Sequence, residues 1–196
     1  MPHHIYTTEA FVLESVAVGE SDRFYTLFTK ELGLVRASGR GVRLEKSKLR
    51  PNLQDFSRIN LSIVRGKEVW RITNAKVEES LHVRYALRKD ILSVIAHLFI
   101  LIKRLVTGEE KNEKLFLVLN DIVRFLDLTD IDPSFSAAFE LIAVLKVLDN
   151  LGYAGENPQL AKFFRNDWSI EKLSEMNNLK HLAVKEINSS LKETQL

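Results

Sequence analysis

Cysteine is absent from the 196-residue chain, and proline and glycine are scarce, with 4 and 8 residues. The lack of cysteine excludes a disulfide framework, a thiolate zinc site and a cysteine nucleophile, and it suits a reducing compartment. No glycine-rich loop with the spacing of a nucleotide-binding motif is found. We therefore expect a cytoplasmic protein that carries no structural zinc and no cofactor.

Long apolar runs are also missing. The most apolar segment, Ile91–Val106, is interrupted by Ser93, His97 and Lys103. It is shorter than the roughly 18 uninterrupted residues that a membrane span needs. The N-terminus, MPHHIYTTEAF, lacks the apolar core of a signal peptide, and the pair His3–His4 is too small to predict a metal site. We expect a buried helix at Ile91–Val106 and no membrane partner.

Groups typical of catalytic sites occur singly. Three histidines are isolated in helical patterns: His82, His97 and His181. The acidic groupings at 109–110 and 127–132 match neither a calcium-binding loop nor a catalytic pair of carboxylates, so they are interpreted as solvated loop acids. The sequence therefore predicts a binding protein and no enzyme, although an unrecognised active site remains the alternative.

Short β-rich runs fill the first 79 residues. Five strands are predicted, at Tyr6–Val18, Arg23–Thr29, Leu34–Gly41, Phe56–Arg65 and Glu68–Val77. Five short strands are too few for an immunoglobulin-like sandwich and suit a closed barrel of the OB type. Gly39 and Gly41 are predicted on one face of the third strand, where the barrel bends or another backbone approaches. Gly66 is expected to supply a positive φ to the turn at 65–67.

Helical periodicity begins at Leu81. Apolar residues at i, i+3 and i+4 spacing predict helices at Leu81–Val106, Glu113–Leu128, Ser134–Leu151 and Leu179–Leu191, with one or two short helices in 154–178. A turn and a capping hydroxyl at 132–134 open the third of these helices, and Gly152 closes it. The fold class is therefore α+β, with an OB-fold domain at 1–79 and a helical bundle at 80–196.

Positive charge is concentrated in one stretch, although the whole chain has a net charge of only +2. The first 80 residues contain 13 Lys and Arg against 10 Asp and Glu, and the rest contains 15 against 16. Six cations lie between 36 and 50, namely Arg36, Arg40, Arg43, Lys46, Lys48 and Arg50. Such a run is either a solvated loop or a surface that binds phosphates.

Aromatic residues of the strand region offer rings for base stacking, namely Phe24, Tyr25, Phe28, Phe56 and Trp70. Strand alternation must place some of these rings in the barrel core, so the sequence does not identify which of them stacks on bases. Core packing is the default interpretation for Trp70, which is flanked by Lys67 and Arg71.

An ordered set of motifs is similar to a known family. The stretch FVLESVAVGESDRFYTLFTKELGLVRASGRGVRLEKSKLRPNLQDFSRINLSI resembles the N-terminal domain of the RecO family of bacterial DNA repair proteins. It contains the family's G-E-S-D-R-like turn, its L-F-T-x-x-x-G segment, a basic stretch, K-S-x-L and Q-x-F. A looser match is FELIAVLKVLDNLGYAG at Phe139–Gly155. The polar turn at Glu20–Arg23 is expected to bond its own backbone.

The resemblance implies an OB-fold joined to a helical domain, acting without catalysis as a recombination mediator. Such proteins bind single- and double-stranded DNA, anneal complementary strands and, with RecR, help load RecA onto strands coated by the single-stranded-DNA-binding protein (SSB). It also implies a groove between Leu81–Val106 and Ser134–Leu151 that receives the acidic, aromatic-ended SSB tail. The cation that holds the tail carboxylate is left open among Arg88, Lys103, Arg104 and Arg124.

This chain departs from the family pattern after Tyr153, where many members carry a zinc-binding cysteine cluster and then a basic tail. Here the sequence continues AGENPQLAKFFRNDW, with no cysteine. DNA contacts through the C-terminal region are therefore in doubt. The resemblance favours phosphate binding by the six cations, with Arg36, Arg40 and Arg43 on or just beyond the third strand and the others in the following loop. The alternative function is an RNA- or translation-associated OB protein with a helical interaction domain.

Overall fold

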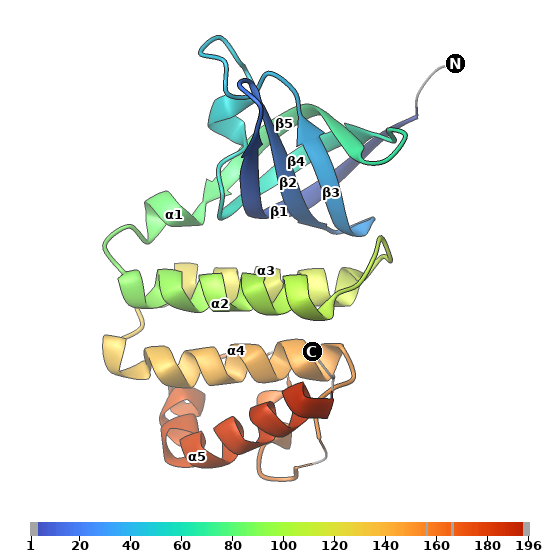
Figure 1. Ribbon diagram of the computed structural model, residues 1–196. Helices are drawn as coiled ribbons and strands as arrows, with labels where there is room; N and C mark the ends of the chain where they lie inside the picture. Colours follow the sequence, from blue (N-terminus) through green and yellow to red (C-terminus); the bar gives the residue numbers. More distant parts are fainter. Residues whose placement is uncertain (1–3, 156, 166, 194–196) are drawn as a thin grey trace. The chain divides into compact units, whose positions relative to one another are not determined.

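The first half of the chain is a closed β-barrel, seen in a computed structural model that describes residues 4–155, 157–165 and 167–193 (Figure 1). Its strands follow the order β1-β2-β3-β5-β4, and β4 returns to pair with β1. Neighbouring strands are antiparallel except β3 and β5, which run parallel. The predicted five-stranded OB-fold barrel is confirmed. The strands are β1 (Ile5–Val18), β2 (Asp22–Thr29), β3 (Gly33–Gly39), β4 (Ser57–Val64) and β5 (Trp70–Ser80).

Alternation along the strands places one set of side chains in the barrel core. Leu27, Val35 and Ile59 are among the residues that fill it and are fully buried. Phe11 points out of the barrel, yet it is also fully buried, because Phe99 of α2 (Lys89–Leu105) lies 5.9 Å from its ring. Phe99 stacks on Phe56 as well, at 5.5 Å. Helix α2 therefore covers part of the barrel's outside.

The glycines act differently from the predictions. The third strand ends at Gly39, so Gly41 lies in the following turn, with φ of 63°. A Cβ on Gly39 would lie 2.8 Å from Tyr25 Cε2, so this glycine makes room for a core ring and not for a backbone. Gly66 has no positive φ, which contradicts the prediction. A Cβ there would lie 2.1 Å from the Val69 carbonyl oxygen, so close packing within the turn requires glycine.

The helices also differ in part from the expected ranges. The single helix predicted from Leu81 is interrupted after Arg84, because the chain turns before α2 begins. The last helix begins at Ile170, so it includes Asn177 and Asn178, which the sequence had placed before it. Burial of neighbouring residues such as Leu173 and Met176 outweighs the low helix propensity of the two asparagines. The remaining elements are η1 (Arg50–Asn52), α1 (Leu81–Arg84), α3 (Glu113–Leu128), η2 (Pro133–Phe135), α4 (Ser136–Asn150), η3 (Ala161–Phe163) and α5 (Ile170–Glu193).

Helix α4 begins and ends largely as expected. Gly152 follows its end with φ of 77°, as predicted for a C-terminal glycine. Before α4 the chain forms the separate 3-10 helix η2, whose N-cap is Asp132, and the Asp132 carboxylate accepts a hydrogen bond from the Ser134 N–H at 2.9 Å. The predicted capping hydroxyl is therefore replaced by a carboxylate that caps η2, and α4 itself begins two residues later than predicted, at Ser136.

The chain divides into two compact units, Met1–Glu113 and Lys114–Leu196. The first contains the barrel, α1 and α2, and the loop after α2 is tied to the barrel by an ion pair between Lys111 and Glu31 at 2.7 Å. In the second, the rings of Phe125 and Phe139 each lie 5.1 Å from the Trp168 ring. Within the described part of the chain, every helix is too short or too polar to cross a membrane.

Candidate nucleic-acid interface

Four strands contribute one row of side chains to the barrel's outer face. Val16 on β1 pairs with Phe24 on β2, Phe24 pairs with Ser38 on β3, and Ser38 pairs with Arg71 on β5. The residues on either side of Arg71 point into the core, so Arg71 faces outward. The next row contains Thr26 and Arg36. The outer face therefore carries an exposed ring, hydroxyls and guanidinium groups side by side, on the strands with which OB-folds bind oligonucleotides.

A cationic groove of about 640 Å³ continues from this row to the loop between β4 and β5. Its charged lining residues are Arg40, Arg65, Lys67, Glu68 and Arg71. The groove thus combines four cations with a single acid, and all four cations are exposed. Such a surface attracts a phosphate backbone from solution.

Arg65, in the same groove, is held in place by contacts with Trp70 and Glu109. Its guanidinium carbon lies 4.9 Å above the Trp70 ring, and it forms an ion pair with Glu109. Glu109 also accepts a hydrogen bond from the Trp70 indole N–H at 2.9 Å. Glu109 is exposed in a loop, as the sequence predicted, and it also has a structural role in the barrel unit through these two contacts. Its charge offsets part of the charge of Arg65, so Arg40, Lys67 and Arg71 contribute most of the net positive charge.

A second cationic pocket, of about 320 Å³, lies at the end of the barrel. Arg23, Arg43 and Arg50 line it together with Tyr25. Burial raises the pKa of Tyr25 to about 12, so its hydroxyl is neutral beside the arginines at physiological pH. Arg43 also donates from Nη1 to the Gly19 carbonyl at 2.7 Å, which fixes its position at the rim. Three guanidinium groups from three segments therefore converge here without a carboxylate in the lining.

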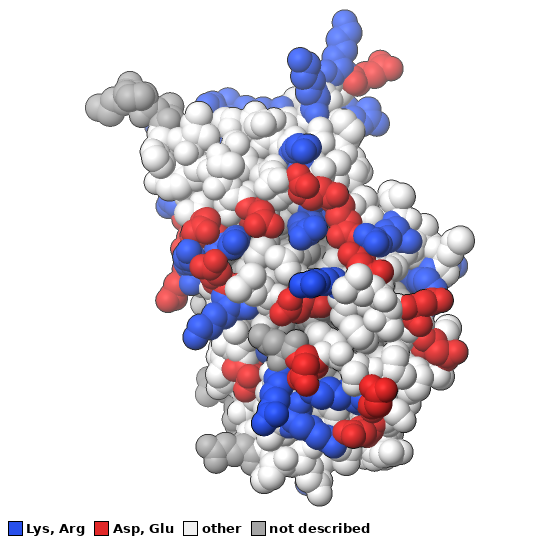
Figure 2. All heavy atoms as spheres, turned by 180° about the vertical axis from the view of Figure 1, so that it is seen from behind, with Lys and Arg blue, Asp and Glu red and all other residues white. Residues whose placement is uncertain are grey.

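The loop between β3 and η1 projects beyond the barrel end (Figure 1). It carries Lys46 and Lys48, which are exposed, and Leu44, which is 56% exposed. On the face drawn in Figure 2, Lys and Arg side chains gather at this upper end of the molecule. The loop extends the cationic surface away from the barrel wall.

Asp22 connects the polar turn to this loop. Its Oδ1 accepts a hydrogen bond from the Gly41 N–H at 2.7 Å and another from the Ser21 hydroxyl at 2.9 Å. These two donors hold the pKa of the Asp22 carboxyl below its usual value. The Arg43 N–H donates to the Ser21 carbonyl at 2.9 Å. The turn was expected to bond its own backbone, but Asp22 instead fixes the start of the basic loop, nineteen residues further along the chain.

The structure distributes the six predicted cations over four places. Arg36 lies on the outer face and Arg40 in the groove beside the β4–β5 loop, whereas Arg43 and Arg50 lie at the barrel end. All six are exposed, with Lys46 and Lys48 in the connecting loop. Arg40 lies one residue beyond the strand, within the range predicted for it.

Sequence reasoning missed four cations of this surface, namely Arg23, Arg65, Lys67 and Arg71. Arg23, at the end of the polar turn, lines the pocket at the barrel end. The alternation along β5, with Trp70 and Ile72 inside and Arg71 outside, is the signal that could have identified the last of them. The other two flank Gly66 in the turn that the sequence had recognised.

The five aromatic candidates differ in their exposure to solvent. Tyr25 and Phe28 are 1% and 0% exposed, and Trp70 is 4% exposed with its edge against Tyr6. Phe56 stacks on Phe99. Phe24 is 39% exposed on the outer face, so it is the ring among these five that is open to a ligand.

Metal-binding groups do not cluster in the part of the chain that is described: no set of three or more His, Asp or Glu side chains is placed to hold an ion there. His3, half of the histidine pair noted in the sequence, lies outside the described residues. His4 contacts the Tyr6 ring at 4.4 Å. The chemistry of the candidate interface is therefore that of cations, hydroxyls and one exposed ring.

Comparison with known proteins agrees with this geometry. Residues 1–81 match the family model described as "Recombination protein O N terminal". The chain is 30% identical to the DNA repair protein RecO of Alkaliphilus metalliredigens over 156 residues, which cover 78% of this chain and 59% of the relative. It is 34% identical to the DNA repair protein RecO of Myxococcus xanthus over 143 residues, covering 71% of this chain and 57% of the relative.

A third relative extends the match. The DNA repair protein RecO of Thermoanaerobacter sp. (strain X514) is 29% identical over 167 residues, which cover 81% of this chain and 66% of the relative. The chain thus spans about three fifths of the length of the curated relatives that it matches. The matched family model covers the whole barrel, and the similarity to the relatives continues into the helices; this chain belongs to the RecO family.

Proposed function

We propose that this protein is a DNA-binding recombination mediator in DNA repair. It binds single- and double-stranded DNA through the barrel, anneals complementary strands and, with RecR, helps load RecA onto SSB-coated single strands. Family membership supports the repair role. The observation that carries the DNA-binding part is the exposed groove in which Arg40, Lys67 and Arg71 lie together on the outer barrel face.

The arrangement suits binding that ignores base sequence. Strands coated by another protein must be engaged whatever their sequence, so contacts fall on phosphates. Long, exposed cations meet this requirement because they reach the backbone without a fixed register. Arg36, Arg40, Arg43, Lys46, Lys48 and Arg50 form the proposed track, and the groove cations on β5 and the β4–β5 loop widen it.

The test is the salt dependence of single-strand binding. If about four of the six cations touch phosphates, log affinity falls with log salt at a slope of roughly −3, because each contact contributes about 0.7. The triple variant Arg40→Ala, Arg43→Ala, Lys48→Ala should flatten that slope by about 2 units and weaken all sequences alike. Fluorescence anisotropy at several salt concentrations measures both. If the salt slope of a folded triple variant is unchanged, residues 36–50 are a solvated loop that does not bind phosphates.

A matched variant separates the loop from the groove. Lys67→Ala with Arg71→Ala removes two cations from the groove alone and keeps Arg40 and the loop. If this double variant and the first triple variant both flatten the slope, one strand crosses both areas. These side chains are exposed, so the midpoint of thermal unfolding should change little in either variant.

Binding of the SSB tail is part of the proposal. Of the four cations considered for its carboxylate, Arg88 is paired with Asp90 at 2.9 Å and Lys103 with Glu14 at 2.5 Å. Arg104 is exposed on α2, one turn after Ile100, which is 56% exposed. An apolar residue and a cation on one helical face match the two ends of an acidic, aromatic-ended tail.

Calorimetry with a synthetic tail peptide tests this contact. Arg104→Ala is expected to weaken peptide binding, whereas Lys114→Ala, at an exposed lysine of α3 that is not among the four candidates, serves as the control. No heat of binding to the unmodified protein at high concentration refutes the tail proposal.

The RNA-associated alternative is tested separately. DNA and RNA oligonucleotides of matched sequence are compared by competition. Equal or tighter RNA binding, together with no annealing of complementary DNA in the presence of SSB, favours that alternative.

A further inference from the structure

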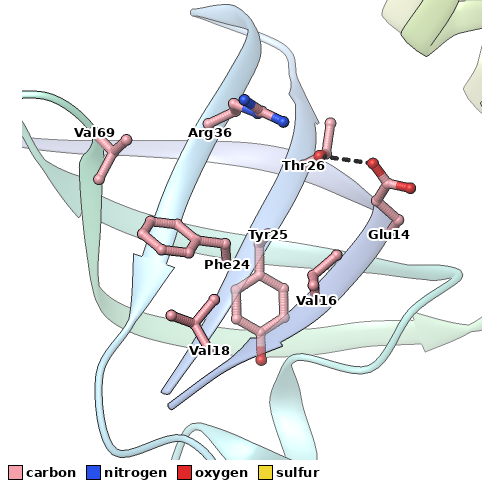
Figure 3. A pocket seen from close by; sticks show the side chains of 8 residues that line it. All are labelled: Glu14, Val16, Val18, Phe24, Tyr25, Thr26, Arg36 and Val69. Atoms are coloured by element: carbon pink, nitrogen blue, oxygen red, sulfur yellow. Dashed lines mark hydrogen bonds between the residues drawn. The ribbon is translucent and has the colours of Figure 1, made fainter.

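An apolar pocket of about 350 Å³ lies on the outer face beside the cationic groove (Figure 3). Its apolar walls are Val16, Val18, Phe24 and Val69. Val69 also lines the cationic groove, so the two depressions are adjacent. In Figure 3 the Phe24 ring lies at the centre of the pocket, between Val18 and Arg36.

The apolar surface of this pocket is open to solvent. Val16, Val18 and Phe24 are 60%, 41% and 39% exposed. They lie on neighbouring positions of β1 and β2, because Val16 pairs with Phe24. A contiguous apolar patch on a strand surface, rimmed by polar groups, indicates a ligand with a flat apolar face.

The two rims of the pocket differ in charge. On the β1 side, Glu14 accepts hydrogen bonds from Lys103 at 2.5 Å and from the Thr26 hydroxyl at 3.2 Å. The bond from Lys103 is the main reason why the pKa of Glu14 lies below its usual value, so Glu14 is ionised at neutral pH. Arg36 on β3 borders the other side, toward the cationic groove. Because Lys103 neutralises Glu14, the β1 rim has no net charge, whereas Arg36 attracts a phosphate to the β3 rim.

From these observations we propose that the pocket holds one unpaired nucleobase of single-stranded DNA, stacked on Phe24, while its phosphates follow Arg36 into the groove. The inference rests on the proposed DNA-binding function and assigns single-strand selectivity to that same surface. A base within a duplex has its faces covered by its neighbours and cannot stack on a protein ring, whereas every unpaired base offers a π-face. The phosphate track binds both forms of DNA, and the pocket favours the single strand.

The test compares Phe24→Ala with Phe24→Trp by anisotropy on a single strand and on a duplex of the same sequence. Phe24→Ala is expected to weaken single-strand binding about ten-fold or more, the effect of removing one stacked base. The salt slope and duplex affinity stay unchanged, because no cation is removed. Phe24→Trp retains binding. Val83→Ala, at another exposed apolar residue of the same unit, is the matched control.

A second measurement leaves the protein unmodified. Oligonucleotides with abasic sites at successive positions keep every phosphate and lack single bases. At least one such substitution should weaken binding of the unmodified protein and have no effect on Phe24→Ala. If abasic sites and Phe24→Ala both leave single-strand affinity unchanged while the cation variants flatten the salt slope, the base pocket is refuted and the DNA-binding function stands. If the cation variants also leave the salt slope unchanged, both the base pocket and the proposed DNA-binding function are refuted.

Discussion

The barrel unit and the helical unit differ in charge. Met1–Glu113 contains 19 Lys and Arg against 14 Asp and Glu, whereas Lys114–Leu196 contains 9 against 12. The near-neutral whole chain is thus a positive unit joined to a negative one. Net charge calculated over the full sequence conceals a nucleic-acid surface when the second unit has the opposite sign.

The two units also use their structural charged groups differently. In the barrel unit, the exposed carboxylate of Glu109 fixes Trp70 and Arg65 beside the groove and so supports the candidate interface. In the helical unit, the most buried cation, Lys146, donates to the Arg165 carbonyl and lies 5.1 Å from the Trp168 ring. Its role is to hold a loop against α4. We infer that the first unit is built for binding anions, and that the second keeps its buried charge for internal packing.

The largest expected effect concerns the boundary of the barrel unit. Phe99→Ala should destabilise the barrel by about 3–5 kcal/mol, because its ring packs on both Phe11 and Phe56 from outside the β-strands. Urea unfolding followed by Trp70 fluorescence, in a Trp168→Phe background, measures it. Ile100→Ala on the exposed side of α2 is the control and should cost little. A loss below about 1 kcal/mol for Phe99→Ala contradicts the assignment of α2 to the barrel unit.

A smaller effect is expected from the buried lysine of the helical unit. Burial lowers the pKa of Lys146 to about 8, from the usual value of 10.5. Between these two values the unfolded chain binds more protons than the folded one, so unfolding free energy rises with pH from about 8 to about 10.5. The gain is roughly 1–3 kcal/mol, and below pH 8 this group adds no pH dependence.

Chemical unfolding at several pH values, followed by Trp168 fluorescence in a Trp70→Phe background, measures that gain. Lys146→Met is the control, because it removes the titrating group while keeping most of the volume. Equal pH profiles for the variant and the parent would show that Lys146 does not titrate in this range. In a Trp168→Phe background, barrel unfolding followed by Trp70 fluorescence should show no such rise in unfolding free energy with pH.

The smallest expected effect tests the charge comparison directly. Lys185→Ala with Lys192→Ala removes two exposed cations from α5 in the negative unit. The salt slope for single-strand binding should remain unchanged, because these side chains lie outside the barrel unit. A flattening of about one unit would show that the helical unit contributes its own phosphate contacts, and would break the contrast between the two units.

Much of the barrel could be predicted from the sequence. Strand existence followed from short runs of β-branched and aromatic residues, and the OB-fold followed from five such runs in one short segment. The glycines were correctly identified as special positions, but the physical reasons predicted for Gly39 and Gly66 were wrong. Gly39 is needed because Tyr25 occupies the space of a Cβ, and that contact joins residues on two paired strands.

The candidate interface was predicted only in part, for a related reason. A run of cations such as Arg36 to Arg50 is visible in the sequence because its members are close in the chain. The groove also needs Arg71, which follows Ser38 by 33 positions in the chain. The parallel pairing of β3 with β5 places Arg71 beside Ser38. Pairing of distant strands has no local sequence signal, so Arg71 was read only as a neighbour of Trp70.

The sequence by itself determined the strand and helix classes, the absence of thiolate chemistry and the place where positive charge gathers, because periodicity, composition and local charge are properties of neighbouring residues. Only the tertiary structure decided which aromatic ring is open. Phe24 and Tyr25 are adjacent on β2, yet barrel closure buries one and exposes the other. The tertiary structure also decided that Asp22 fixes the basic loop, because that contact exists only after β2 and β3 have paired. Closing the barrel therefore turns a list of cations and rings into one surface with a cationic side and an apolar side.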